Sequence, residues 1–250
     1  MQCHNDIMDT PRPVPITVTF SQELTPRTRR ITFEGPIVID TSFPASYLSL
    51  YFSDPGSDWQ EGKGAATPPK RTYTPRYLLP ECDSMTIDFV LHGEGRATQW
   101  ALTASAGDVI WAGHVTGGYD VPDDLSHLVL VGDDTAIPAI GTVVEAIPDG
   151  ARTTVIIEVI DEDDERDPSD VVPCDPIWLH RGTDVTDVGD QMLNLVRSIT
   201  VPPSAYWWLA GEREAILAVR DYLVTTRQVP RDRIAAAAYW RIVPLDPRLR

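Results

Sequence analysis

Six consecutive residues, from Arg71 to Arg76, place two cations, an aromatic ring and hydroxyl groups within one short segment. A guanidinium pairs bidentately with phosphate oxygens, and an aromatic face stacks on a planar ligand. On an extended strand Arg71 and Tyr73 share one face, while Thr74 and Arg76 share the other unless the strand bends. Pro75 favours such a bend, or an edge position. The segment therefore indicates either a ligand-binding strand or an ordinary barrel strand with solvated arginines.

A second candidate begins with the strand-like residues 88–92, which run through Gly93 and Gly95 into the helix-like residues 96–101. A strand that passes through a glycine turn into a helix exposes backbone N–H groups, which suit a phosphate. The same glycines are equally compatible with a plain turn.

A third candidate lies where buried strands end. The apolar run 128–132 leads into Asp133, Asp134 and Thr135, and a second run ends at Gly211 and Glu212. In a parallel sheet the ligand sits beyond the carboxyl ends of the strands, so these residues are expected to face it. Thr135 is also a candidate helix N-cap, with no ligand required.

The elements that must position these groups fall into two halves. Residues 15–121 alternate apolar and polar side chains in short segments with Gly and Pro breaks, which predicts an antiparallel barrel of six strands. Residues 122–250 carry apolar runs separated by helix-like stretches, including a crossover helix over 212–226, which predicts a parallel α/β sheet. Residues 1–14 are expected to be a flexible tail. The five predicted parallel strands are 127–132, 154–160, 177–180, 206–210 and 234–240.

Composition narrows the class of protein. Against 21 Lys and Arg stand 37 Asp and Glu, and a formal charge of -16 repels nucleic acid and acidic membranes. The apolar runs are too short to span a bilayer, and the N-terminal stretch lacks the features of a secretory signal, so a cytoplasmic protein without nucleic-acid or membrane partners is expected. The three cysteines are widely spaced and the five histidines form no i, i+4 pair, which predicts no metal site. Redox chemistry would therefore need a bound cofactor.

Four of these segments, taken in order, closely resemble the siderophore-interacting protein family of ferric-siderophore reductases, relatives of the ferredoxin reductases. The family patterns are R-x-Y-T-x-R, D-F-V-x-H-G, A-[ST]-x-W-A and G-D-[DE]-T-A-[LI]-P-A-I, and the chain matches them at 71–76, 88–93, 97–101 and 132–140. Family-like endings follow at 208–212 and 239–241. The chain departs from the family at Arg96, where proline is common, and at His114, which follows a glycine where proline is usual.

The resemblance implies a two-domain α+β, ferredoxin-reductase-like fold with FAD on the barrel and a nicotinamide cofactor on the α/β domain. It places Arg71 near the FAD pyrophosphate, Tyr73 against the flavin ring and Thr74 near its reactive nitrogen, so that Tyr73 and Thr74 are the candidate catalytic residues. It places Asp134, Thr135, Gly211 and Glu212 at the nicotinamide. The remaining implied FAD contacts are Arg76, Asp88, Val90, His92, Ala97, Thr98 and Trp100.

The choice between NADH and NADPH stays open at this stage. An acidic run, Asp161 to Asp167, follows the second parallel strand, and acid at this edge accepts a ribose hydroxyl and repels a 2′-phosphate. Arg166 or Arg181 would instead bind that phosphate, and a solvated loop is a third interpretation.

The favoured function is an FAD-dependent reductase that passes electrons from NADH or NADPH to a ferric siderophore. A reductase of the same fold that serves ferredoxin, a haem protein or free flavin is one alternative, and a siderophore carrier without turnover is another. A chain of this charge needs local cations to admit an anionic chelate, and we expect them at Lys63, Lys70 and Arg241. A monomer is expected.

Overall fold

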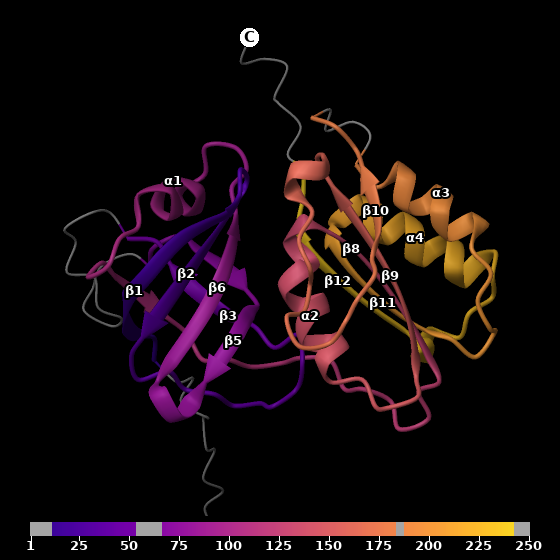
Figure 1. The fold of residues 1–250 in the computed structure, drawn as a ribbon, viewed down its shortest axis with the longest axis horizontal. Helices are drawn as coiled ribbons and strands as arrows, with labels where there is room; N and C mark the ends of the chain where they lie inside the picture. The colour runs from indigo at the N-terminus through magenta and orange to yellow at the C-terminus, as the bar shows by residue number, and fades with distance from the viewer. Residues whose placement is uncertain (1–11, 54–66, 184–187, 243–250) are drawn as a thin grey trace, which may run out of the picture.

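The computed structural model describes residues 12–53, 67–183 and 188–242. Within these residues two sheets form, a seven-stranded antiparallel one from the first half of the chain and a five-stranded parallel one from the second (Figure 1). Most of the expected tail and Lys63 lie outside the described residues.

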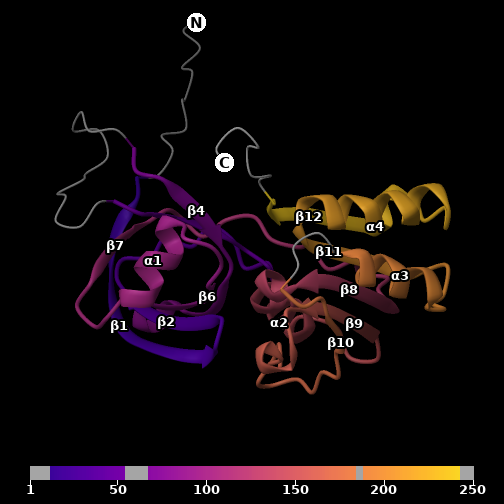
Figure 2. The same cartoon turned by 90° about the horizontal axis from the view of Figure 1, so that it is seen from above.

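The first sheet is a barrel with the strand order β4-β3-β7-β1-β2-β6-β5. Its alternating side chains meet in a core around Phe33, Ile87 and Phe89, each at most 1% exposed. Helix α1 lies across one end of the barrel (Figure 2), and its Ala101, with Ala104 directly after the helix, joins that core. The elements are β1 (Val14–Thr25), β2 (Thr28–Glu34), β3 (Leu48–Tyr51), β4 (Lys70–Tyr73), β5 (Pro75–Leu79), β6 (Ser84–Val90), α1 (Arg96–Thr103) and β7 (Val109–Ala112).

The expectation of six barrel strands is wrong, because the segment 71–76 is divided. Strands β4 and β5 stand at the two ends of the sheet order, and Thr74 alone separates them in the chain. Pro75 has no N–H to donate to a ladder, so the chain leaves one edge of the sheet at Thr74 and joins the other. The two edge strands of the barrel are therefore joined directly through Thr74, the residue expected next to the flavin.

The second sheet has the order β10-β9-β8-β11-β12, with all adjacent strands parallel. Chain order reverses between β8 and β11, the position at which ligands bind in open α/β sheets. Helix α2 covers the face toward the barrel, and α3 and α4 cover the opposite face (Figures 1 and 2). The elements are β8 (His127–Asp133), α2 (Ile137–Glu145), β9 (Arg152–Val159), β10 (Ile177–His180), α3 (Asp190–Ser198), β11 (Tyr206–Glu212), α4 (Arg213–Thr225) and β12 (Ile234–Trp240).

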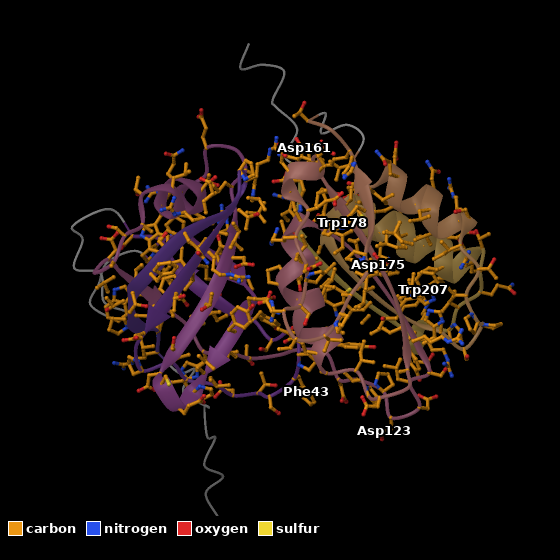
Figure 3. All side chains as sticks on the ribbon, in the orientation of Figure 1. Phe43, Asp123, Asp161, Asp175, Trp178 and Trp207 are labelled. Atoms are coloured by element: carbon orange, nitrogen blue, oxygen red, sulfur yellow. The ribbon has the colours of Figure 1, made fainter. Side chains whose placement is uncertain are left out.

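The loop after β9 joins the two domains. We call residues 161–170 the acidic clasp, because Asp161 and Asp164 in it bind Arg27 of the barrel. Asp161 lies on the barrel-facing side of the α/β domain (Figure 3) and accepts hydrogen bonds of 3.0 and 2.8 Å from Arg27. Asp164 binds the same guanidinium at 2.7 Å and the Thr25 hydroxyl at 3.1 Å. Two carboxylates of the acidic run thus join the domains, whereas Glu162, Asp163, Glu165 and Asp167 are exposed.

Candidate functional site

The end of β4 presents the first predicted cofactor residues. Arg71 is exposed and donates a 2.9 Å hydrogen bond to the Lys70 carbonyl. The Tyr73 ring is half-buried with its centroid 4.6 Å from that of Phe89, and burial raises the pKa of its hydroxyl well above the usual range. Thr74 is 9% exposed at the junction between β4 and β5. Tyr73 is therefore a neutral, partly covered ring beside an exposed cation.

The turn after β6 has the form expected of a phosphate site. Gly93 has a φ of 58°, and Gly95 is the N-cap of α1 and makes no side-chain capping hydrogen bond, so the helix begins directly at a glycine turn. Thr98 is buried and donates a 2.9 Å hydrogen bond to the His92 carbonyl, which closes the turn. His92 Nδ1 lies 3.1 Å from the carbonyl of Val90.

The remaining residues of this turn support it from behind. Trp100 stacks 6.2 Å from Phe33 and, with the half-buried Ala97, packs on the barrel core. Both side chains hold α1 against the barrel, and their expected contacts with FAD stay predictions.

Two predicted FAD residues are engaged in the protein itself. Arg76 is 3% exposed and places two guanidinium nitrogens 2.6 and 3.2 Å from the Glu145 carboxylate of α2. Asp88 is buried and receives hydrogen bonds of 2.7 and 3.0 Å from Arg30. The Asp88 carboxylate is therefore occupied by Arg30, and the Arg76 side chain faces the domain junction.

At the carboxyl end of the parallel sheet, Asp133 is the central group. It is 0% exposed, and its Oδ1 accepts from the backbone N–H and the hydroxyl of Thr135, at 3.0 and 2.5 Å. Its Oδ2 accepts from the Glu212 backbone N–H at 2.7 Å and from the Trp240 indole N–H at 2.8 Å. The expectation that Thr135 caps the following helix is wrong, because the Asp133 side chain caps this turn and binds the Thr135 hydroxyl.

Glu212 and Gly211 shape the neighbouring strand end. Glu212 caps α4 by accepting from the backbone N–H groups of Glu214 and Ala215 at 2.6 and 2.9 Å. Gly211 has a φ of 147°, and a Cβ at this position would lie 2.5 Å from Asp133 Oδ2. A residue with a side chain would displace the carboxylate, so glycine is required here.

Two functional candidates were absent from the sequence-based set, Tyr239 and Trp240 at the end of β12. Ala238 pairs with Gly211 and Trp240 pairs with Glu212, which leaves Tyr239 as an extra residue in the ladder, a β-bulge. Bulges are rare in parallel pairs and frequent near active sites, where they redirect side chains. The signal in the sequence was an aromatic pair at the end of an apolar strand.

Both aromatics reach the barrel. The Tyr239 hydroxyl lies near Thr74, and although the residue as a whole is 38% exposed, burial of its hydroxyl end raises the pKa to about 12. The Trp240 ring lies 5.8 Å from the His92 ring, measured between centroids. The structure thus brings the expected flavin residues and the expected nicotinamide edge to one junction.

The donor set at this junction suits FAD. An uncapped helix start beside two glycines and an exposed Arg71 can receive a pyrophosphate, and the half-buried Tyr73 can cover a planar ring. Among the described residues, no cluster of three or more His, Cys, Asp and Glu side chains could hold a metal ion.

Comparison with known proteins agrees with this geometry. Residues 17–114 match the family model of the siderophore-interacting FAD-binding domain, and residues 125–242 match that of the siderophore-interacting protein. The ferric vibriobactin reductase ViuB of Vibrio cholerae is 31% identical over 85% of this chain and 83% of its own length. This chain belongs to the siderophore-interacting protein family.

Solved structures extend the comparison to the fold. The siderophore-interacting protein SipS from Aeromonas hydrophila is 28% identical, with a TM-score of 0.79 over 92% of each chain. Phthalate dioxygenase reductase is 13% identical, with a TM-score of 0.65 over 90% of this chain and 68% of its own, and shows the fold alone. This siderophore-interacting protein has a ferredoxin-reductase-like fold, its barrel is an FAD-binding domain, and the protein is a flavoprotein oxidoreductase.

The two departures from the family pattern lie at the start of α1 and at the exit from the barrel. Arg96 is the first residue of α1 and is exposed. His114 Nδ1 lies 3.0 Å from Asp40 Oδ2 and joins the chain leaving β7 to the segment around Ile39. The proline usual in the family is thus replaced by a polar contact that holds the same exit from the barrel.

The cations expected at the substrate entrance are only partly described. Lys70 is exposed, with its ammonium 5.9 Å from the centre of the Tyr51 ring, and Arg241 is exposed directly after Trp240. Lys70 and Arg241 therefore flank the predicted flavin strand and the aromatic pair. Their contact with substrate stays a prediction.

Several charged groups are buried behind the nicotinamide edge. Burial, reinforced by the adjacent Asp133, raises the pKa of Asp134 to about 7, although Arg181 and Arg166 oppose the rise. Burial raises the pKa of Glu158 to about 7 against the hydrogen bonds that it accepts from the Gly189 N–H. Burial lowers the pKa of the Arg166 guanidinium, which lies 3.8 Å from Asp88.

Proposed function

We propose that this protein reduces siderophore-bound iron(III), drawing electrons from NADH or NADPH through FAD and releasing iron(II). The supporting observation is the junction at the end of the parallel sheet, where the Trp240 ring lies 5.8 Å from that of His92 and the Tyr239 hydroxyl lies near Thr74 of the FAD-binding barrel. A reductant bound at the carboxyl ends of β8 and β11 would lie beside a flavin bound at β4. The related ViuB is by name a ferric vibriobactin reductase.

FAD, when bound, accepts a hydride from the nicotinamide and passes the electrons on singly. The protein's part is to bind and orient the reactants. Arg71 and the start of α1 would hold the FAD phosphates, Tyr73 would cover the ring, and Thr74 would offer its hydroxyl near the reactive nitrogen. Glu212 and Gly211 would position the nicotinamide, with Asp134 and Thr135 behind it. No general acid or covalent nucleophile is needed.

The substrate would enter on the side of Lys70 and Arg241, where exposed cations offset the formal charge of -16. Iron(II) binds hard oxygen ligands more weakly than iron(III), so reduction itself favours release. We propose that the protein acts as a monomer in the cytoplasm. No helix among the described residues is long and apolar enough to cross a membrane.

The direct test is an anaerobic titration of the purified, FAD-loaded protein. NADH and NADPH are added separately and flavin bleaching is followed, and then ferric siderophores of different chelating chemistry are added while a colorimetric iron(II) trap reports product. The proposal predicts bleaching by a nicotinamide and reoxidation of the flavin by a ferric siderophore with matching iron(II) yield.

Two outcomes would point to the alternatives. Rapid electron transfer to ferredoxin or a cytochrome, with none to ferric siderophores, would assign the chain to another reductase of the same fold. A yellow protein that binds ferric siderophore but is bleached by neither nicotinamide would be a carrier.

A further inference from the structure

We infer that Asp133 is a positioning residue for hydride transfer, because it holds the Trp240 ring against the FAD phosphate turn at His92. This inference rests on the proposed function, and it adds a role for two residues that the family motifs do not identify as contacts of either cofactor. The chain of contacts runs from the β8 end through Trp240 to His92 of the barrel.

The first step is that both oxygens of the Asp133 carboxylate accept two hydrogen bonds each. An ionised carboxylate has about four lone-pair sites, and Asp133 fills them with the N–H and hydroxyl of Thr135, the N–H of Glu212 and the indole N–H of Trp240. A fully buried carboxylate with every acceptor site occupied has little freedom to rotate. Its Oδ2 is therefore a fixed point for both neighbouring strand ends.

The second step is that the local backbone is adapted to this contact. Only glycine at position 211 leaves room for Asp133 Oδ2, since a Cβ there would approach to 2.5 Å. The bulge at Tyr239 shifts the register so that Trp240, and not Tyr239, stands opposite Glu212. Without the extra residue, alternation would exchange the directions of the two aromatic side chains.

The third step is the consequence across the domain junction. With its N–H anchored 2.8 Å from Asp133, the Trp240 ring meets His92 at a centroid distance of 5.8 Å, while the Tyr239 hydroxyl lies near Thr74. Both links connect the strand end expected at the nicotinamide to the barrel strand expected at the flavin. We therefore expect them to fix the distance between the nicotinamide ring and the flavin ring. A displacement of about 1 Å in such a geometry lowers a rate by as much as a hundredfold.

The test compares Asp133→Asn, Trp240→Phe, their double variant and a control, Glu158→Gln. Asparagine keeps the shape of Asp133 but turns an NH2 group toward N–H donors, and phenylalanine keeps an aromatic ring without the indole N–H. Glu158 is a buried carboxylate opposite Asp133 in the β8–β9 ladder, with its hydrogen bonds directed to Gly189. Anaerobic stopped-flow bleaching without iron gives the limiting rate and the apparent Kd for NADH or NADPH. Thermal unfolding of the FAD-free proteins and FAD binding by fluorescence quenching are measured on the same set.

We expect each single variant of the pair to lower the limiting bleaching rate about tenfold, with FAD affinity within about threefold of the parent. The double variant should be no slower than Trp240→Phe, because Asp133 acts through the indole, and Glu158→Gln should stay within about twofold of the parent. A purely structural Asp133 would lower the melting temperature and leave the bleaching rate unchanged, and that result overturns the inference. So do additive rate losses in the double variant. If Asp133→Asn does not fold, an unchanged rate in Trp240→Phe is sufficient to overturn it.

Failure of the proposed function looks different. A parent protein that is bleached by a nicotinamide but does not reduce ferric siderophores contradicts that function and leaves the rates of the variants fully interpretable. If neither nicotinamide bleaches the parent, the unfolding data still decide. Asp133→Asn should lower the melting temperature less in the Trp240→Phe background than in the parent, and equal losses in the two backgrounds overturn the coupling.

Discussion

Replacement of Arg76 and Glu145 separates cofactor binding from domain packing. Family resemblance implies that Arg76 contacts FAD, whereas its guanidinium is 3% exposed and lies 2.6 Å from a Glu145 carboxylate that is 25% exposed. Glu145 also accepts a 2.7 Å hydrogen bond from Ser169 of the acidic clasp. Methionine at either position keeps much of the side-chain volume and removes the charge.

The difference in burial fixes the expected order of the effects. Glu145→Met leaves an unpaired guanidinium buried at the junction, which should destabilise the protein by about 3 to 4 kcal/mol. Arg76→Met leaves a carboxylate that still binds Ser169 and reaches water, so the expected loss is about 1 to 2 kcal/mol. In the double variant an apolar pair replaces the ion pair, and its stability should fall within about 1 kcal/mol of Arg76→Met.

Thermal unfolding of the FAD-free proteins measures these differences, at roughly 2 to 4 °C for each kcal/mol in a chain of this size. Glu145→Met should therefore melt roughly 6 to 16 °C below the parent, and the double variant should recover most of that loss. FAD affinity should stay within about threefold of the parent in all three variants. If Arg76→Met weakens FAD binding while Glu145→Met does not, Arg76 binds the cofactor directly and the packing role is refuted.

Three further predictions concern the cofactor, the substrate and pH. Arg71→Ala should raise the Kd for FAD about 10- to 150-fold by removing a charge-assisted phosphate contact of about 1.5 to 3 kcal/mol, and flavin fluorescence titration with Arg29→Ala as control checks it. Lys70→Gln, alone and with Lys63→Gln, should raise the KM for an anionic ferric chelate at low salt. The effect should shrink above the roughly 0.1 M salt at which the Debye length is about 10 Å, and an unchanged KM at low salt removes these lysines from the entrance. Because burial raises the pKa of Glu158 from 4.5 in the unfolded chain to about 7, the unfolding free energy should fall as pH rises between these values. Glu158→Gln should flatten that slope in urea titrations, and an unaltered slope contradicts the assignment.

The parallel sheet was predictable because burial on both faces produces unbroken apolar runs. Strands 177–180 and 234–240 have the predicted bounds, and the helix predicted over 212–226 is α4, Arg213–Thr225. The barrel was predictable in type and wrong in count. Alternation locates strands, but it does not show that Pro75 transfers the chain from one sheet edge to the other at Thr74.

The site was predictable where a motif is local and was missed where contacts are distant in sequence. The turn formed by His92, Gly93 and Thr98 lies within a few residues of chain. The Asp133–Trp240 bond joins residues 107 positions apart, and Arg27 and Asp161 are 134 apart. Composition could not show that Asp161 and Asp164 pair with Arg27 of the barrel, because that pairing depends on how the two domains pack.

The placement of the acidic clasp changes what the net charge means for substrate and reductant. Asp161 is engaged by Arg27, and Arg166 lies against Thr28 and Asp88, so both side chains have partners within the protein. The clasp and Glu145 also neutralise Arg27 and Arg76, which leaves exposed cations such as Arg71, Lys70 and Arg241 around the junction. Screening limits attraction to about 8 to 10 Å in physiological salt, so an approaching anionic chelate responds to these nearby cations more than to the charge of -16 spread over the molecule. An acidic protein can therefore admit an anionic substrate at a local cluster of cations, and the internal ion pairs keep Arg27 and Arg76 from competing for it.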